Sequence, residues 1–317
     1  MSGTISSGLR VQALTTASWL ACRLPEGPLV QLAELAGDLW YRMAPDRAAQ
    51  ARRNLRRVCE SLAKTGRGTP TTRAAATDPR ALERLVRSAF RHNARYYLEV
   101  ARTPGISRAF LDERLDLDAS ELVAHALEPG TASLFVGLHF GSVELPALFL
   151  AFRVGAVVTP METVDDPGLQ AWFERTRGVN GVRLVGLREA RRTLMEALRS
   201  GIPVGIVGDR DLTGGGIPIP LFGAPAVMPM GPAMVAVESG VPVYGIGVRR
   251  IGRGRYRARL IPIDVPTEGT RRERVTSTMT LLAAAFERVV EDAPEQWWAV
   301  FFPIWPDLET AAPRSAA

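Results

Sequence analysis

The sequence predicts an α/β fold with a mostly parallel central sheet, flanked by helices and preceded by a helical region. Residues 9–102 carry apolar positions at helical spacing, whereas from Arg114 onward short apolar runs alternate with helix-like segments. Hydrophobic residues make up 46% of the 317 residues, which is enough for a sizeable core. We therefore expect an N-terminal helical region over 1–105 and an α/β core over 106–317, packed as one globular unit.

The first part of the chain predicts two helices within 9–43, separated at Pro25-Glu26-Gly27-Pro28 because proline is poorly tolerated inside a helix. Each helix carries an apolar face with a tryptophan, Trp19 or Trp40, close to arginines. Such a face either lies in a membrane interface or packs on the rest of the domain, and the residues leave both interpretations open.

An arginine-rich helix and a long helix complete the helical region. The helix expected over 46–63 presents arginines that are either lipid-facing or simply solvated, the second being favoured by the residues alone. A polar loop is expected over 65–78. Asp78 and Pro79 then predict the start of a helix that continues to about Arg102.

The rest of the chain predicts strands and helices in alternation. Strands are expected at 114–117, 134–136, 155–158, 182–185, 203–207, 243–248 and 256–263. Helices are expected near 120–126, 143–152, 168–177, 189–199, 232–239 and 271–291. This alternation is typical of parallel sheets, whose ligands bind at the carboxyl ends of the strands.

Composition narrows the function classes. The net charge of +6 comes almost entirely from arginine, and a basic surface fits anionic lipids or phosphate-bearing substrates. No nucleic-acid-binding signature is present, so no nucleic-acid partner is expected. Two cysteines, Cys22 and Cys59, predict no disulfide framework. No signal peptide is expected, because the sequence lacks a basic n-region followed by a long apolar core and an A-x-A site. No membrane-spanning helix is expected either, since the longest uncharged stretch, 212–237, contains five prolines.

The segment Leu134–Glu144, LFVGLHFGSVE, is the strongest candidate for chemistry. An apolar strand is expected to end at Gly137-Leu138, directly before His139, and Ser142 is a candidate N-cap of the next helix. The H-x4-E spacing would bring Glu144 to the imidazole and leave the other ring nitrogen free to accept a hydroxyl proton. A purely structural histidine is the competing interpretation, and the residues alone leave the two about even.

Further charged residues lie near the ends of other predicted strands, namely Glu162, Arg177, Asp209 and Arg210. Several such charges converging on one sheet edge fit a polar-substrate site, although loop solubility produces the same pattern. The run Thr213–Gly216 lacks the G-K-[ST] ending of a phosphate-binding loop. Residues 137–141 have the glycine spacing of a nucleophile elbow but hold histidine at its centre, which disfavours a serine hydrolase.

Taken together, these motifs resemble the bacterial lipid A biosynthesis acyltransferases and their relatives, the phosphatidylinositol mannoside acyltransferases. HFGSVE at 139–144 is similar to the family's H-x4-[D/E] signature, and 177–181 is similar to its R-x-x-x-G. The segment 208–240, beginning GDRDL, resembles the family's D-x-D/FFG/GPA-x-x-A region. PEQWW at 294–298 resembles its P-x-Q-W.

The resemblance implies an N-terminal membrane-docking region, an α/β acyltransferase core, and no metal or cofactor. It implies acyl-CoA or acyl carrier protein as donor and a membrane glycolipid hydroxyl as acceptor, at the cytoplasmic face of the cell membrane. His139 would be the general base and Glu144 its orienting partner. The expected substrate-binding residues are Glu162, Arg177, Asp209 and Arg210.

Two branches of the family compete. The uncharged ending AVFFPIWP at 299–306 and DRDL at 209–212 resemble the mannoside branch, whereas Glu144 is the acid typical of the lipid A branch. We favour a mannose of a phosphatidylinositol mannoside as acceptor, with another glycolipid as the alternative. An apolar groove for the acyl chain is expected from 212–237 and 297–305, together with an anionic membrane surface as partner and a monomeric state.

Two rivals fall outside this activity. A non-enzymatic lipid-binding protein would keep the amphipathic N-terminus but would have no need of His139 with Glu144. A thioesterase would place a water molecule where the acceptor hydroxyl should be.

Overall fold

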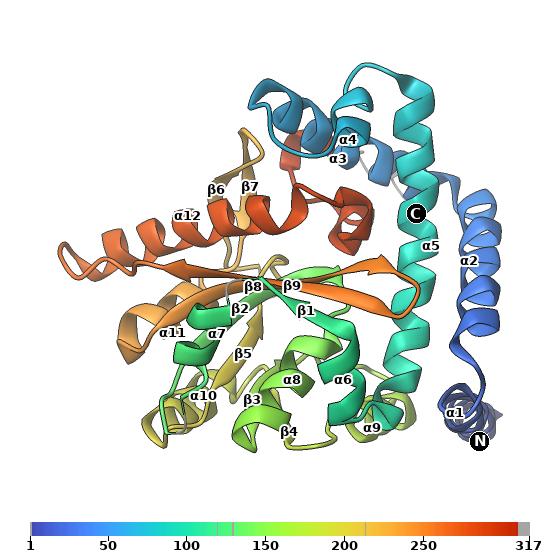
Figure 1. Cartoon of the computed structure of the whole chain (residues 1–317), viewed down its shortest axis with the longest axis horizontal. Coiled ribbons are helices and arrows are strands. Elements are labelled where there is room, and N and C mark those ends of the chain that lie inside the picture. The colour runs from blue at the N-terminus through green and yellow to red at the C-terminus, as the bar shows by residue number, and fades with distance from the viewer. Residues whose placement is uncertain (1, 119, 129, 213, 310–317) are drawn as a thin grey trace.

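A mostly parallel sheet forms the centre of the computed structural model (Figure 1). Within the residues that the structure describes, 2–118, 120–128, 130–212 and 214–309, seven strands are arranged in the order β1-β9-β8-β2-β5-β3-β4. Every neighbouring pair is parallel except β8 and β9. The strands are β1 (Leu115–Leu117), β2 (Leu134–Gly141), β3 (Val157–Met161), β4 (Val182–Gly186), β5 (Val204–Val207), β8 (Val243–Gly252) and β9 (Arg255–Ile263). The predicted fold class is confirmed.

Two apolar cores lie on opposite faces of this sheet, because successive side chains of a strand point to opposite sides. Phe135 of β2 belongs to the core that includes α8, whereas Leu134 and Val136 belong to the core that includes α11 and α12. The helices of this part are α6 (Arg108–Arg114), α7 (Ser120–Ala126), α8 (Glu144–Val154), α9 (Pro167–Arg177), α10 (Ala190–Arg199), α11 (Gly231–Ser239) and α12 (Arg271–Val290).

A separate antiparallel hairpin, β6 (Ile217–Leu221) with β7 (Ala224–Met228), occupies the proline-rich stretch where no strand was predicted. Its prolines are exposed and alternate with buried side chains such as Ile219 and Leu221. Proline is tolerated where a strand has no further neighbour to receive its missing N–H, and a two-stranded hairpin meets that condition. The alternation of buried and exposed residues that is typical of a strand is therefore present here, but the exposed positions are held by prolines.

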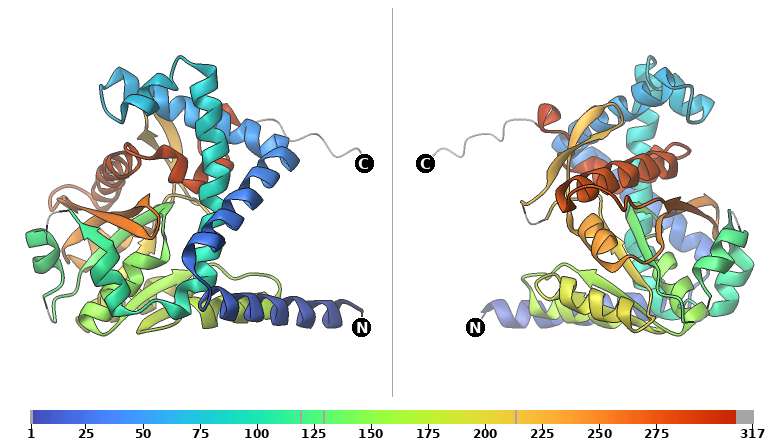
Figure 2. Two further views of the ribbon diagram at one scale, coloured as in Figure 1. Left: turned by 45° about the vertical axis from the view of Figure 1, so that its right-hand side comes forward. Right: turned by 90° about the vertical axis from the view of Figure 1, so that its left-hand side faces the viewer.

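The N-terminal region is helical, with α1 (Ser2–Ala21), α2 (Glu26–Met43), α3 (Pro45–Lys64), α4 (Pro70–Ala74) and α5 (Pro79–Arg102). Helix α2 packs along α5, and α1 projects from the base of that pair (Figure 2). The loop predicted over 65–78 contains the short helix α4, whose N-cap Thr69 accepts a hydrogen bond from the N–H of Thr72. None of the described helices is both long and apolar enough to cross a lipid bilayer.

Short 3₁₀ segments close the described chain, namely η2 (Pro294–Gln296), η3 (Trp298–Phe301) and η4 (Pro306–Leu308), and η1 (Thr103–Gly105) follows α5. Side chains of α3 and α5 share one continuous apolar core with those of α12 and β2. The outermost residues of the two predicted regions, Met1 and 310–317, lie outside the described residues.

Candidate active site

His139 lies near the C-terminal end of β2, in the middle of the sheet between β5 and β8. The strand was predicted to end at Gly137-Leu138, but it continues to Gly141, with a shift of register against β8. Gly141 has a φ of +56°, and a Cβ there would lie 2.0 Å from the carbonyl oxygen of Val248. Only glycine fits this position, and it permits the close approach of β2 to β8 beyond the predicted end of the strand.

The imidazole is hydrogen-bonded to Asp209. Its Nδ1 lies 2.6 Å from Oδ1 of Asp209, and the backbone N–H of His139 donates to Oδ2 at 3.0 Å. Strands β2 and β5 are adjacent and parallel, with Gly137 opposite Val207, so the residues two positions further on meet. The predicted pairing of the imidazole with Glu144 is therefore wrong, since no hydrogen bond joins those two side chains among the described residues.

The surroundings of Asp209 stabilise the ionised form of its carboxylate. Its side chain is buried, and a third hydrogen bond comes from Nε1 of Trp297 at 2.7 Å. Burial alone would raise the pKa of Asp209, but the charge of His139 and the bonds from His139 and Trp297 hold the pKa below its usual value. A carboxylate on Nδ1 keeps the ring proton on that nitrogen, which leaves Nε2 with the lone pair.

The C-terminal P-x-Q-W residues hold this arrangement in place. Gln296 accepts from the N–H of Arg250 at 2.8 Å and donates to its carbonyl oxygen at 2.9 Å, which attaches the segment to β8. Trp297 then reaches Asp209, and the ring of Trp298 packs edge-on against His139 with centroids 4.1 Å apart. The three consecutive residues of this segment thus contact β8, the carboxylate of Asp209 and the imidazole of His139, respectively.

A buried ion pair supports the turn that follows His139. Arg250 donates to both carboxylate oxygens of Glu99 at 2.6 Å and to the carbonyl oxygen of Gly141 at 2.9 Å. Since Glu99 belongs to α5 and Arg250 to β8, this pair joins the N-terminal helices to the sheet beside β2. Neither residue was predicted from the sequence, because nothing in their local patterns distinguishes them from surface charges.

Glu144 faces a different partner. It is the first residue of α8, and its Oε1 lies 3.1 Å from Nε of Arg177, which also donates to the hydroxyl of Tyr96 at 2.5 Å. Burial alone would lower the pKa of Arg177, but the negative charge of Glu144 raises it above its usual value. The N-cap predicted for Ser142 is not formed; Val143 occupies that position and no side chain caps the helix.

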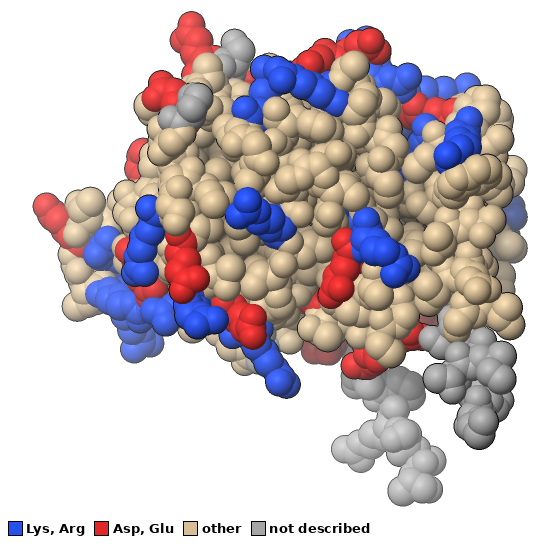
Figure 3. Space-filling model, turned by 90° about the horizontal axis from the view of Figure 1, so that it is seen from below, with Lys and Arg blue, Asp and Glu red and all other residues tan. Residues whose placement is uncertain are grey.

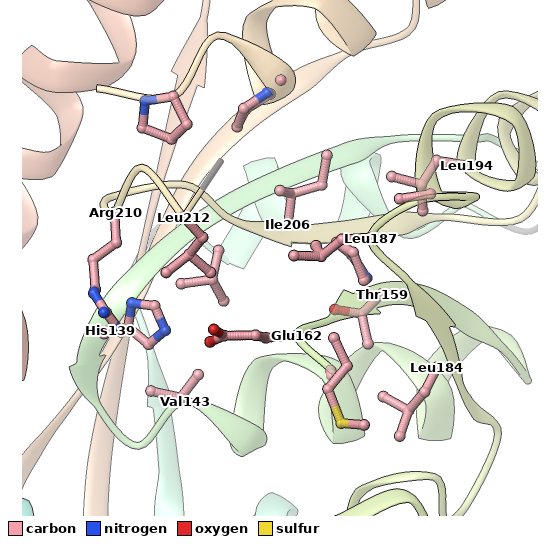
Figure 4. Close-up of a pocket in the computed structure, with 18 of the residues that line it drawn as sticks. His139, Val143, Thr159, Glu162, Leu184, Leu187, Leu194, Ile206, Arg210 and Leu212 are labelled. Carbon is pink, nitrogen blue, oxygen red and sulfur yellow. The ribbon is translucent and has the colours of Figure 1, made fainter. Parts of the chain in front are cut away.

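A cavity of about 640 Å³ opens at His139 (Figure 4). Charged or polar lining residues include His139, Glu144, Glu162, Arg177 and Arg210. Of these, His139, Glu162 and Arg210 lie at one end, the polar end, where the Glu162 carboxylate points toward His139. Its far end is lined by apolar side chains, among them Leu184, Leu187, Leu194 and Ile206.

The structure therefore brings together five of the six predicted site residues around one cavity. The sixth, Asp209, was predicted to bind substrate, but it is buried behind His139 and does not line the cavity. Of the predicted groove, Leu212 and Met234 line the wall, whereas Trp297 lies against Asp209 instead. Thr213, in the glycine run, lies outside the described residues.

Comparison with known proteins points to one family. Residues 71–303 match the model of the bacterial lipid A biosynthesis acyltransferases. The chain is 28% identical over 288 residues to a phosphatidylinositol mannoside acyltransferase of Mycobacterium tuberculosis, covering 89% of this chain and 84% of that protein. It is 27% identical over 217 residues to a protein of the same name from Mycolicibacterium smegmatis, covering 67% and 70% of the two chains.

Proposed function

The chain belongs to the bacterial lipid A biosynthesis acyltransferase family, and on that premise we propose that it moves a fatty acyl group from acyl-CoA to a sugar hydroxyl of a membrane glycolipid. It is an enzyme of the acyltransferase type. The observation that carries the proposal is the hydrogen-bonded pair of His139 and Asp209 at one end of a largely apolar cavity.

The proposed chemistry is direct transfer without an acyl-enzyme. Nε2 of His139 takes the proton of the acceptor hydroxyl as its oxygen attacks the thioester carbonyl carbon. The C–O bond forms, the C–S bond of the tetrahedral intermediate breaks, and the leaving sulfur receives the proton from the imidazolium. Asp209 stabilises that imidazolium and keeps the ring oriented. General-base catalysis of this kind contributes roughly 10²–10⁴ in rate.

The two ends of the cavity suit the two parts of the reaction. The apolar end, near Leu184 and Leu194, fits the acyl chain, because apolar side chains there remove methylene groups from water. At the polar end Glu162 offers hydrogen-bonding groups for sugar hydroxyls beside His139, and Arg177 lines the same cavity. The names of the two mycobacterial relatives support a phosphatidylinositol mannoside as the acceptor, and another glycolipid is the alternative.

Helix α2 supports a peripheral position on the cytoplasmic face of the cell membrane. All of its acidic residues are paired with arginines of the body: Asp38 with Arg87 and Arg91 at 2.6–2.7 Å, Glu34 with Arg95 at 3.4 Å, and Glu26 with Arg114 at 2.6 Å. The opposite face of the helix exposes Leu32 by 65%, Leu35 by 65%, Leu39 by 56% and Met43 by 72%.

This polarity is the reverse of an ordinary surface helix, which buries its apolar stripe and exposes its charges. A row of exposed leucines on a helix with its charges turned inward fits a lipid interface. Arg23 and Arg42 are exposed near its two ends and suit anionic headgroups, each contributing about 1 kcal/mol. On the face seen in Figure 3, by contrast, basic and acidic side chains are interspersed.

The transfer reaction is tested with purified protein, acyl-CoA and phosphatidylinositol mannoside, with products identified by mass spectrometry. We expect an acylated glycolipid, and its loss in a His139→Ala variant whose circular dichroism matches the wild type. Free fatty acid formed at the same rate without acceptor would identify a thioesterase instead. Tight lipid binding with no product in either protein would identify a lipid-binding protein.

The membrane position is tested by sedimentation with anionic and neutral vesicles at low and high salt. Replacing Leu32 and Leu35 by Gln should lower vesicle binding on the order of tenfold or more, since each buried leucine contributes about 1.5–3 kcal/mol. Leu281→Gln, on α12, removes an exposed leucine elsewhere and is the matched control. If the Leu32/Leu35 variant pelleted with vesicles as well as the wild type and the Leu281→Gln control, α2 would not be the membrane-binding surface.

A further inference from the structure

Two arginines lie against the same aromatic ring at the edge of the cavity. The guanidinium carbon of Arg210 is 3.9 Å from the ring centroid of Phe302, and that of Arg47 is 5.5 Å from the same centroid. Arg210 also lies 5.5 Å from the centroid of Trp298, whose ring contacts His139. An aromatic ring orients a guanidinium and leaves its N–H groups available at the edges.

Neither arginine has a carboxylate partner among the described residues, which sets the pair apart from its neighbours. Arg57 also lies over a ring, that of Trp305, but forms an ion pair with Asp307 at 2.5 Å. Arg177, another residue that lines the cavity, is paired with Glu144. Arg47 and Arg210 therefore place two uncompensated positive charges on one ring.

Like charges at close range repel, and a planar fork of N–H donors matches the oxygens of a phosphate. We propose that Arg47 and Arg210 together bind a phosphate group of a substrate while Phe302 holds them apart and oriented. A bound phosphate would neutralise both cations and accept hydrogen bonds from each. The proposal deepens the acyltransferase function and rests on it for the identity of the phosphate.

The position of the pair suits a phosphate that accompanies the reacting group. Arg210 lines the cavity at the same end as His139 (Figure 4). Arg47 lies in the first turn of α3, four residues beyond Met43, where the exposed apolar face of α2 ends. A phosphate held here would lie between the proposed lipid interface and the catalytic histidine. Both substrates carry phosphates: the nucleotide and pantetheine phosphates of acyl-CoA, and the phosphodiester of a phospholipid acceptor.

Binding is measured first, by calorimetry and without any reaction. The donor is represented by coenzyme A against phosphate-free pantetheine, and the acceptor by detergent micelles containing phosphatidylinositol against diacylglycerol. Arg47→Gln and Arg210→Gln should each weaken binding of one phosphate-bearing probe roughly 10- to 100-fold, as expected for a lost charge-assisted hydrogen bond. The phosphate-free probes should be unaffected. Whichever probe responds identifies the source of the phosphate.

Because one phosphate is shared, the double variant should lose less than the product of the two single losses. Arg153→Gln is the control for removing a positive charge over a ring, since Arg153 lies 5.2 Å from the ring centroid of Phe149 but is paired with Asp112 at 3.2 Å. Arg210→Lys, which keeps a point charge without the planar fork, should bind with intermediate affinity.

Transfer kinetics then separate this proposal from the proposed function. A phosphate site predicts that Arg210→Gln raises KM for the responding substrate and leaves kcat near the wild-type value. Unchanged affinity for both phosphate-bearing probes in both single variants would overturn the proposal, even if transfer proceeds normally. Equal losses of kcat with phosphate-free thioesters would overturn it too, by assigning Arg210 to the reacting carbonyl. Wild-type protein that binds a phosphate probe but transfers no acyl group would contradict the proposed function alone.

Discussion

Two carboxylates lie near His139, and their surroundings are opposite. Asp209 is buried, accepts three hydrogen bonds from His139 and Trp297, and forms no ion pair with an arginine or lysine of the described residues. Glu144 lines the cavity and is paired with Arg177. The negative charge of Asp209 is thus balanced by the imidazole of His139, whereas that of Glu144 is balanced by the permanent positive charge of Arg177.

This difference assigns the two carboxylates different tasks. A carboxylate whose charge is balanced only by the imidazole favours the imidazolium, because it gains a full charge interaction when Nε2 takes a proton. A carboxylate already paired with an arginine stabilises an imidazolium much less, because its charge is already neutralised. We expect Asp209 to assist proton transfer by stabilising the imidazolium of His139. The pair of Glu144 with Arg177 is expected to help position the acceptor.

The largest expected effect is on Asp209. Asp209→Asn should lower kcat by roughly 10²–10³, because the amide keeps the shape but no longer stabilises the imidazolium. KM for the acceptor should change little. Transfer rates at saturating acceptor, with circular dichroism as the folding control, measure this. If Asp209→Asn retained near wild-type kcat, the imidazole would have to be oriented by another group.

Glu144→Gln should have a smaller effect, of a different kind. Losing one charged partner of Arg177 is expected to cost about 1.5–3 kcal/mol of positioning, seen as a KM increase of about 10-fold or more with a lesser fall in kcat. Glu144→Asp should keep part of the activity. A kcat loss as large as that of Asp209→Asn, with KM unchanged, would return Glu144 to the role of the orienting acid.

The difference between the two carboxylates also explains what the sequence could predict. The apolar run before His139 and the alternation of segments after Arg114 predicted the sheet, because hydrophobic periodicity is a local property. Glu144 is five residues from His139 and was chosen for that proximity. Asp209 is seventy residues away, and its contact with His139 depends on β5 lying next to β2, which a single sequence does not reveal.

The same limit applies to the other residues that sequence reasoning missed. Glu99 and Arg250 form a buried ion pair between elements far apart in the chain, and each alone has the appearance of a solvated charge. The acidic face of α2 could not be recognised from the sequence for a related reason, since the arginines that bind it come from α5 and α6. Long-range pairing, rather than local pattern, decided these features.

A third effect concerns the indole that holds Asp209. Trp297→Phe removes one of three hydrogen bonds to the carboxylate, so we expect kcat to fall about 3- to 10-fold, well short of Asp209→Asn. Trp305→Phe is a matched control, because Trp305 is equally buried but donates to the carbonyl oxygen of Leu221. Both variants should lose similar stability in urea, and only Trp297→Phe should lose kcat. Equal kcat in the two would show that the indole serves packing alone.

The smallest expected effect extends the comparison to a third carboxylate, Glu295, one residue before Gln296. Unlike Asp209 and Glu144 it forms no side-chain hydrogen bond or ion pair in the part of the chain that the structure describes. Burial raises its pKa from 4.5 to about 7, and the charge of Arg249 opposes that rise only in part. The folded state therefore binds more protons than the unfolded state between these pH values, so stability falls as pH rises through that window and levels off above it.

Glu295→Gln should remove this pH dependence and stabilise the protein at pH 8 by about 1–2 kcal/mol, a figure that allows for the partial exposure of the side chain. At pH 5, where Glu295 in the folded wild type is mostly protonated, the two proteins should differ little. Urea unfolding at both pH values measures this, with the exposed Glu268→Gln as control. A larger gain at pH 5 than at pH 8 would reverse the sign and imply that the stabilisation of the Glu295 charge by its surroundings outweighs the effect of burial, as it does for Asp209.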